Sequence, residues 1–507
     1  MGKIKVHEKA LAHLSRGLYR SPASALRELV SNAWDASARI VRIDTGAPHF
    51  SELTVQDDGE GFTGEDFVSL MEGGIGNSEK RVGPPTLIND RPIIGRLGIG
   101  MLGIAQITGG FTITSKPRNG KGFRARVQLY DLIRPRLDKD DKDIVVLPDE
   151  VDVGEYQLLD DFDPGRYKVG TTIVADDLHP AFVQSFRESY QKPPRNWAEF
   201  IRRSTKKATI QELGDHWRLV WELAAACPLP YVGARAIPDH LVADDHKKLE
   251  GFAFKVLVDG LELRKPVCLA GNESGYTTHR IQPTTQRVFG RDVSFHGYIV
   301  VQEGKQITPD ELRGIMIRIR QVGIGLYDRS LLDYRYNEGP RSRWITGEVY
   351  VDQGLEDALN IDRDSFNRFH PEFRLIQKQM HEALQDVVFP KVYKQIDVRS
   401  DARRDTRTRQ RTKFIREVLA EGSDAQVKLH QTKAGKLEEV LASSIVRRSG
   451  KRLEVDLPSP EAMPTKKPNR LLASAIVAIY DSSQQEVSQS RRRDTFIQRV
   501  LSLLAKW

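Results

Sequence analysis

The chain has 507 residues, of which 39% are hydrophobic and 29% are charged, a balance typical of a globular protein with more than one domain. No apolar run is long enough to span a bilayer, and the first residues lack the apolar stretch of a signal peptide. We therefore expect no membrane segment and a cytoplasmic protein. The two cysteines, Cys227 and Cys268, lack metal-type spacing, which argues against a disulfide framework or a zinc site.

The net charge of +8 is unevenly distributed along the chain. Residues 396–507 contain 23 Lys plus Arg against 14 Asp plus Glu, an excess of nine, so the preceding residues are nearly neutral. A basic excess confined to one end favours an anionic partner more than a high pI spread over the whole surface does.

The first predicted helix begins at Pro22, with Ser21 as its N-cap. It places Glu28, Asn32 and Asp35 on one stripe, because residues three or four positions apart lie above one another on a helix. Leucine, valine and alanine side chains form the opposite, buried side. On its own, such a polar stripe is typical of a solvated face, so the helix needs support from other motifs.

Further motifs follow at orderly spacing. A strand over 53–57 is predicted to run into a glycine-rich turn, a second glycine-rich turn over 95–100 precedes an apolar helix, and a third glycine at position 170 opens another apolar strand. The positions of interest in these turns are Asp57, Gly59, Gly61, Gly95, Gly98, Gly100 and Thr171.

Together these pieces match the motifs E-x-x-x-N, D-x-G-x-G, G-x-x-G-x-G and a late G-T. In this order they resemble the GHKL superfamily of ATPases, which includes gyrase B subunits, the ninety-kilodalton heat-shock chaperone, histidine kinases and MutL. The resemblance implies an N-terminal Bergerat-type α/β sandwich that binds ATP and Mg²⁺, over residues 1–178. Helices on one face of a mixed sheet are the expected layout.

The resemblance also implies roles for the residues around the nucleotide. Glu28 is the expected base that orients or deprotonates water, and the side-chain oxygen of Asn32 is the expected Mg²⁺ ligand. Asp57 is expected to accept a hydrogen bond from the adenine amino group, with Thr171 as a second adenine contact. Asp35 is a candidate nucleotide contact whose alternative role is to support the helix and the neighbouring loop.

The phosphates are expected at the second glycine-rich turn, where Gly95, Gly98 and Gly100 let the backbone wrap an anion before a helix N-terminus. The turn is not a Walker loop, since no Gly-Lys-Ser/Thr follows. Residues 73–96 have the composition of a movable lid, in which Ser78 and Lys80 are candidate phosphate contacts. A plain solvated loop is the alternative interpretation.

The second segment, residues 179–395, mixes strands and helices and contains an Asp259-Gly260 hairpin signal. Near its end, residues 359–366 resemble the L-N-x-x-R-E turn in the middle, or transducer, domain of the heat-shock chaperone, with Asp364 in place of the usual Glu. By analogy Arg363 is expected to reach the γ-phosphate and to act with Glu28 in catalysis. A surface ion pair of Arg363 with a neighbouring aspartate is the alternative, and Lys265 or Lys305 are other candidates for that cation.

The third segment, residues 396–507, is predicted to be mainly helical and carries no recognised motif. The fold class is therefore α+β, with an ATP-binding domain, a transducer-like domain and a basic, mostly helical C-terminal segment.

The first functional hypothesis is an Mg²⁺-dependent ATPase that clamps a protein client as a homodimer, as the heat-shock chaperone does. A MutL-like or MORC-like clamp that closes on DNA through the basic segment is the second hypothesis. A scaffold that senses nucleotide without hydrolysing it is the third, and the presence of Glu28 argues against it.

Overall fold

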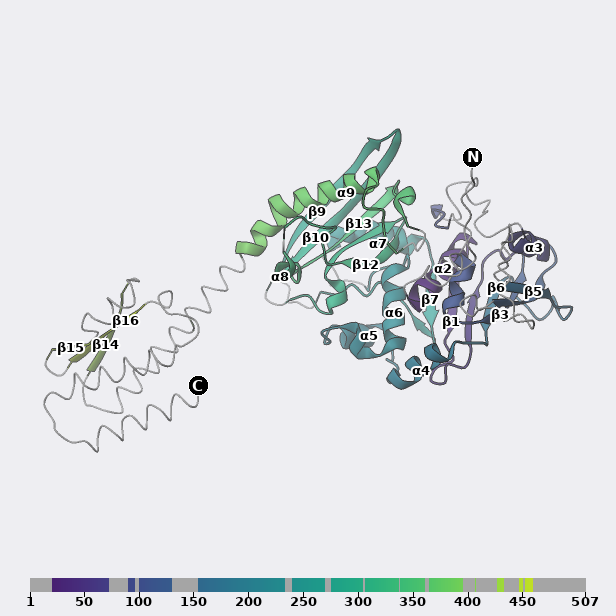
Figure 1. Cartoon of the computed structure of the whole chain (residues 1–507), viewed down its shortest axis with the longest axis horizontal. Helices are drawn as coiled ribbons and strands as arrows, with labels where there is room; N and C mark the ends of the chain where they lie inside the picture. The colour runs from purple at the N-terminus through teal and green to yellow at the C-terminus, as the bar shows by residue number, and fades with distance from the viewer. Residues whose placement is uncertain are drawn as a thin grey trace, which may run out of the picture. The chain divides into compact units, whose positions relative to one another are not determined.

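The structure is a computed structural model that describes residues 21–72, 90–95, 100–129, 154–232, 239–269, 275–303, 306–336, 338–360, 364–394, 406, 426–432, 446–449 and 452–458. The chain divides into two compact units, Met1–Val392 and Tyr393–Trp507. Each unit is described here by itself (Figure 1). Within the first unit we call residues 21–269 the first domain and residues 275–392 the second domain.

An eight-stranded sheet forms the first domain, in the order β5-β4-β3-β6-β2-β1-β7-β8. Neighbouring strands are antiparallel except for β1 and β7, which run parallel. The strands are β1 (Ile40–Asp44), β2 (Leu53–Asp57), β3 (Gly110–Lys116), β4 (Phe123–Leu129), β5 (Gly154–Leu158), β6 (Gly170–Ala175), β7 (Lys255–Val258) and β8 (Leu261–Glu262). The mixed sheet expected from the sequence is therefore present.

The sheet does not end at residue 178, where the sequence placed a domain boundary. The predicted hairpin at Asp259 and Gly260 is present between β7 and β8, with φ angles of +49° and +79° at its two turn residues. Yet β7 pairs with β1, so this hairpin completes the first sheet and does not belong to the second one. A parallel pairing between strands more than 200 residues apart leaves no local signal in the sequence.

The helices of the first domain are α2 (Pro22–Asp35), α3 (Gly64–Glu72), α4 (Pro180–Ser189), α5 (Trp197–Ser204), α6 (Asp215–Ala226) and α7 (Asp239–Gly251), with short 3-10 helices η3 (Gly100–Gln106) and η4 (Ile210–Leu213). The predicted start of α2 is confirmed, because the Ser21 side chain accepts a hydrogen bond from the Ser24 N–H at 3.3 Å. Leu26, Leu29 and Val30 are buried in the core of the domain. The apolar helix predicted after the second glycine-rich turn is the short 3-10 helix η3.

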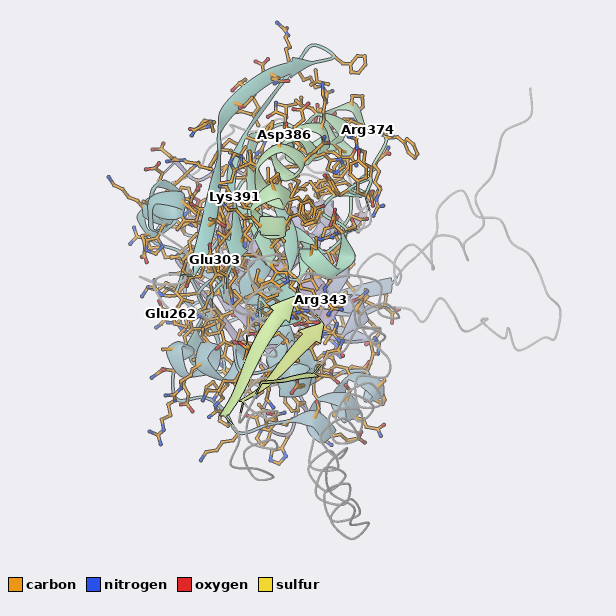
Figure 2. All side chains as sticks on the ribbon, turned by 90° about the vertical axis from the view of Figure 1, so that its left-hand side faces the viewer. Glu262, Glu303, Arg343, Arg374, Asp386 and Lys391 are labelled. Atoms are coloured by element: carbon orange, nitrogen blue, oxygen red, sulfur yellow. The ribbon has the colours of Figure 1, made fainter. Side chains whose placement is uncertain are left out.

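A five-stranded sheet in the order β12-β11-β13-β10-β9 forms the second domain. Its strands are β9 (Tyr276–Val288), β10 (Arg291–Gln302), β11 (Gly314–Ile319), β12 (Val322–Asp328) and β13 (Ile345–Gln353), and its short helices are η5 (Asp310–Leu312), α8 (Gly339–Ser342) and η6 (Glu356–Ala358). Helix α9 (Pro371–Ala383) continues as a π-helical turn, η7 (Leu384–Val388), and packs on this sheet through Phe373, Ile376 and Met380. Figure 2 shows this helix between Arg374 and Lys391.

A buried carboxylate, Glu348 on β13, connects the strands of the second sheet to the first domain. It accepts hydrogen bonds from Arg318 Nε at 3.0 Å and Nη2 at 2.5 Å, and its side chain is fully buried. Four tyrosine hydroxyls also donate to it, those of Tyr231, Tyr298, Tyr327 and Tyr350. Burial disfavours its charge, but the attraction of Arg318 and Lys265 outweighs burial and holds the Glu348 pKa well below its ordinary value.

Two members of this cluster come from the first domain. Tyr231 follows α6 and Lys265 follows β8, and the backbone of these two residues forms an isolated parallel bridge. The Lys265 ammonium lies over the rings of Tyr231 and Tyr350, with Nζ 4.6 and 5.1 Å from their centroids. The Tyr231 hydroxyl and the Lys265 ammonium therefore connect the first domain to the buried Arg318–Glu348 pair of the second domain.

The described part of the second unit is a small sheet in the order β14-β16-β15. Its strands are β14 (Gln426–Thr432), β15 (Val446–Ser449) and β16 (Arg452–Pro458). The sequence predicted a mainly helical segment, and these residues are strands instead. In β16, Leu453, Val455 and Leu457 alternate with charged residues, a period-two strand signal that the prediction missed. Among the residues that the structure describes, no helix combines the length and the apolar character needed to cross a bilayer.

Candidate nucleotide-binding site

Helix α2 carries the three polar residues that the sequence placed on one stripe. Glu28 is 3% exposed and Asp35 is also buried, whereas Asn32, one turn after Glu28, is half-buried. Nearly the whole helix is buried, so the stripe is not the solvated face that such a pattern commonly indicates. Carboxylates in such positions need partners, and each of the two has them.

Asp35 holds the segment that leads into the second glycine-rich turn. Its Oδ1 accepts the Ile94 N–H at 2.8 Å and its Oδ2 accepts the Gly95 N–H at 2.7 Å. The indole N–H of Trp34 donates to the Pro92 carbonyl at 2.8 Å and fixes the same segment. Asp35 therefore has the supporting role that the sequence left open as the alternative to nucleotide contact.

Three side chains lie in a row across the first sheet at the end of β2. Asp57 pairs in register with Thr171 on β6, and Thr171 pairs in register with Ser115 on β3. Directly opposed residues on adjacent strands point to the same face of a sheet. The Thr171 and Ser115 hydroxyls are 3.1 Å apart. Ser115 is a site residue that the sequence did not identify, because strand register is not visible in it.

Burial raises the pKa of Asp57 to about 6, although the N–H groups of Gly59 and Thr171 act in the opposite direction. The Gly59 N–H donates to Oδ1 at 2.8 Å. Above pH 6 this side chain is mainly a carboxylate, which accepts hydrogen bonds and donates none. An amino group with hydrogens to donate is therefore a suitable ligand group for this end of the site.

The glycines after Asp57 are required by the folded chain itself. A Cβ on Gly59 would lie 2.7 Å from the Ala36 carbonyl oxygen at the end of α2. Gly61 has φ +63°, and a Cβ there would lie 2.5 Å from the Lys116 carbonyl oxygen. Close contact with the protein backbone therefore requires glycine at both positions.

The remaining predicted phosphate contacts are only partly described. Gly95 is held by Asp35, and Gly100 begins η3. Several predicted residues lie outside the described residues, namely Ser78, Lys80, Gly98, Lys305 and Arg363. Lys265 is not a γ-phosphate contact in this structure, because it is fully buried in the Glu348 cluster. Burial there lowers the pKa of Lys265 to about 7.

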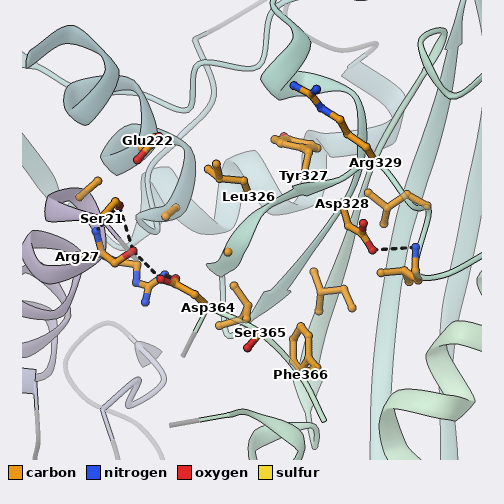
Figure 3. Close-up of a pocket in the computed structure, with 18 of the residues that line it drawn as sticks. Ser21, Arg27, Glu222, Leu326, Tyr327, Asp328, Arg329, Asp364, Ser365 and Phe366 are labelled. Carbon is orange, nitrogen blue, oxygen red and sulfur yellow. Dashed lines mark hydrogen bonds and ion pairs between the residues drawn. The ribbon is translucent and has the colours of Figure 1, made fainter. Parts of the chain in front are cut away.

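A carboxylate of the second domain contacts α2, the helix that carries the expected base. Asp364 Oδ1 accepts from Arg27 Nη1 at 2.6 Å, and its Oδ2 accepts from the Ser24 hydroxyl at 2.7 Å. Arg27 also forms an ion pair with Glu28, with Nη2 and Oε1 3.3 Å apart. Figure 3 shows Arg27 and Asp364 in contact with each other in the wall of a cavity of about 470 Å³, which residues of β12 and α6 also line.

The Arg27 side chain is buried, and so is Asp364. Burial disfavours the charge of Arg27, but the attraction of Asp364 and Glu28 outweighs burial, so the Arg27 pKa is raised above its ordinary value. The sequence analysis considered Asp364 only as a partner of Arg363, and it did not identify Arg27 or Ser24. No sequence signal could have found this contact, because its partners are more than 330 residues apart.

A second contact joins the second domain to the loop that Asp35 holds. The turn between β11 and β12 carries Arg320, whose Nη1 donates to the Ile93 carbonyl at 2.6 Å. Its Nη2 lies 2.5 Å from Glu356. The second domain therefore contacts both the start of α2 and the segment that enters the glycine-rich turn.

Residues 19–159 match the family model described as histidine kinase-, DNA gyrase B-, and HSP90-like ATPase. The chain is 39% identical to the "Putative type II restriction enzyme HgiDII" of Herpetosiphon aurantiacus over 97 residues, 19% of this chain and 15% of that protein. It is 29% identical to the DNA mismatch repair protein MutL of Coxiella burnetii over 199 residues, 39% of this chain and 29% of that protein. The matched parts thus cover less than a third of either relative.

The matched range contains α2 with Glu28 and Asn32, the β2 turn with Asp57, and the glycine-rich turn that follows Asp35. These are the parts on which the sequence resemblance rested, and they lie on one α+β domain. The N-terminal domain of this chain is therefore a member of the GHKL superfamily of ATPases, with the MutL type among its relatives.

Proposed function

We propose that the chain is an Mg²⁺-dependent ATP hydrolase that acts as a homodimeric, ATP-gated clamp on duplex DNA in the cytoplasm. The observation that carries the proposal is the buried contact of Asp364 with Ser24 and Arg27, next to Glu28. It links the second domain to the helix that bears the expected base, so a change at the nucleotide is transmitted to the second domain.

The side chains of the site fit adenosine triphosphate at both ends. Asp57 offers acceptor oxygens to the adenine amino group, and the hydroxyls of Thr171 and Ser115 lie beside it. Glu28 orients the attacking water and accepts its proton. Asn32 would supply an amide oxygen to Mg²⁺. When bound, Mg²⁺ neutralises charge on the phosphate oxygens.

Arg363 is part of this proposal because it directly precedes Asp364 in the sequence. A guanidinium delivered from the second domain would stabilise charge that develops on the γ-phosphoryl group, and its release would follow hydrolysis. The second domain then senses whether the γ-phosphate is present.

Two observations favour DNA over a protein client. The relatives found are a mismatch repair protein and a protein named as a restriction enzyme, both of which are named for action on DNA. Residues 396–507 carry a basic excess of nine, which suits a polyanion. The chaperone-like clamp expected first from the sequence, and the non-hydrolysing scaffold, are the competing outcomes of the experiments below.

Replacing Glu28 by alanine should leave ATP binding intact and lower turnover by roughly 100-fold or more, because a positioned general base contributes about that much. Phosphate release under single-turnover conditions measures the rate, and a fluorescent nucleotide measures binding. Glu65→Ala, at an exposed position on α3, is the matched control. Equal rates for Glu28→Ala and the wild type would remove Glu28 from its role, and a wild type that binds ATP without turnover would indicate the scaffold.

Replacing Asp364 by asparagine should lower kcat about ten-fold with little change in KM, because Arg27 loses one of its carboxylate partners while the nucleotide contacts stay. Asp364→Glu should restore most of the rate. Asp333→Asn breaks an exposed ion pair with Arg368 in the same domain and serves as the control. Assays run well below the melting temperature of each variant. A kcat for Asp364→Asn within two-fold of the Asp333→Asn value would contradict the coupling.

The DNA client is tested by a mobility shift with a 30-base-pair duplex and a non-hydrolysable ATP analogue over a salt series. We expect binding that weakens by about 10³-fold or more between 50 and 200 mM salt, because several phosphates are neutralised. The chain that ends at Val392, where the first compact unit ends, should show a smaller slope. Absence of any shift at low salt with the full chain would exclude DNA and favour a protein client.

A further inference from the structure

The turn at the end of the β9–β10 hairpin has an unusual residue. Val288 pairs with Arg291, so the turn consists of two residues, Phe289 and Gly290, with φ angles of +46° and +83°. Two-residue turns with both φ angles positive favour Asn-Gly, because asparagine and glycine tolerate the left-handed region. A bulky aromatic residue there is an outlier.

Phe289 is also 88% exposed, the highest value among the large hydrophobic residues that the structure describes. Packing of its ring in the folded chain therefore offsets neither the strain of the left-handed backbone nor the exposure of the ring to water. Figures 1 and 2 show the far end of the hairpin extending past α9, away from the rest of the second domain. Because strained backbone is found at functional sites, the left-handed conformation of Phe289 makes this tip a candidate contact surface.

The charge of the hairpin indicates the chemistry of a partner. Residues 276–302, the two strands and their turn, contain three arginines and one aspartate, Asp292, which lies opposite Arg287 in the strand register. Arg280 forms an ion pair with Asp244 and Arg291 forms one with Asp357, but Arg287, next to the turn, has no ion-pair partner among the described residues. Most of the other exposed side chains on this arm of β9 are amides or hydroxyls, those of Gln282, Thr285 and Gln286.

We propose that the β9–β10 hairpin contacts duplex DNA, with Phe289 inserted between base pairs as a wedge and Arg287 on a neighbouring phosphate. This inference rests on the proposed function, in which duplex DNA is the client. Apolar side chains inserted between base steps unstack and kink a duplex, and a two-stranded ribbon is narrow enough to enter a groove. Amide and hydroxyl groups along β9 can both donate to and accept from base edges.

A protein partner fits the same observations less well. A phenylalanine ring buries at most about 250 Å², whereas a specific protein interface buries about 1,200 Å² or more. A single ring at a hairpin tip is therefore too small to hold a protein partner. One ring is enough for a wedge, because stacking one base on one aromatic ring already changes affinity by roughly ten-fold.

The test uses the full chain, a non-hydrolysable ATP analogue and a 30-base-pair duplex that carries 2-aminopurine, whose fluorescence rises when a base is unstacked. Phe289→Asn is the decisive variant, since it creates the favoured Asn-Gly turn and should keep or raise thermal stability while removing the wedge. Phe289→Trp keeps an aromatic wedge. Phe369→Ala, at another phenylalanine that is 81% exposed, is the matched control.

We expect Phe289→Asn to bind the duplex roughly ten-fold more weakly and to lose the rise in fluorescence, with ATP turnover in the absence of DNA unchanged. Phe289→Trp and Phe369→Ala should behave as the wild type. Arg287→Ala should lower the slope of log affinity against log salt by about one, as expected for one phosphate contact.

The proposal is overturned if Phe289→Asn retains the affinity and fluorescence of the wild type, which would leave the DNA client in place. A change in sedimentation of Phe289→Asn without a change in DNA binding would also overturn it and assign the turn to a second copy of the chain. If the wild type fails to bind the duplex at any salt concentration, the DNA client and the wedge both fall.

Discussion

A buried ion pair between Arg27 on α2 and Asp364 in the second domain is the constraint on which the arrangement depends. Both side chains are withdrawn from water, at 2% and 8% exposure, so each charge depends on partners inside the protein. Because Arg27 directly precedes Glu28 and also pairs with it, the expected base cannot be repositioned without disturbing this contact. The Arg27–Asp364 pair therefore links the helix that carries the expected base to the second domain.

Two further contacts make the connection between the domains rigid. The Glu348 cluster draws an arginine and three tyrosines from the second sheet and a tyrosine and a lysine from the first domain. Arg320 reaches the carbonyl of Ile93 before the glycine-rich turn. In the proposed function, a change at the nucleotide would reach the second domain through these contacts.

The sequence predicted those features that local chemistry decides. The cap at Ser21, the strand that ends in Asp57 and the turn at Asp259 and Gly260 are confirmed, because each follows from a few neighbouring residues. Contacts set by tertiary packing could not be predicted. The pairing of β7 with β1 is one example, and the row formed by Asp57, Thr171 and Ser115 is another.

The same distinction applies to individual site residues. The sequence left Asp35 between nucleotide contact and support, and only the position of the Ile94 and Gly95 N–H groups assigns it to support. Lys265 was a reasonable candidate for a phosphate contact from its charge alone, yet its burial beneath Tyr231 and Tyr350 excludes that role in this structure. Charge is visible in a sequence, whereas burial is decided by the whole fold.

The proposed site depends most on a half-buried aspartate at the end of β2, Asp57, as the group that recognises adenine. Calorimetric titration of the purified chain with magnesium and either ADP or GDP tests it most directly, because guanine presents a carbonyl oxygen where adenine presents an amino group. We expect heat of binding with ADP and an affinity for GDP that is lower by roughly 100-fold. The guanine carbonyl oxygen would face the Asp57 carboxylate, and neither of these two acceptors can donate a hydrogen bond to the other. No heat with ADP, or equal affinity for the two nucleotides, would contradict it.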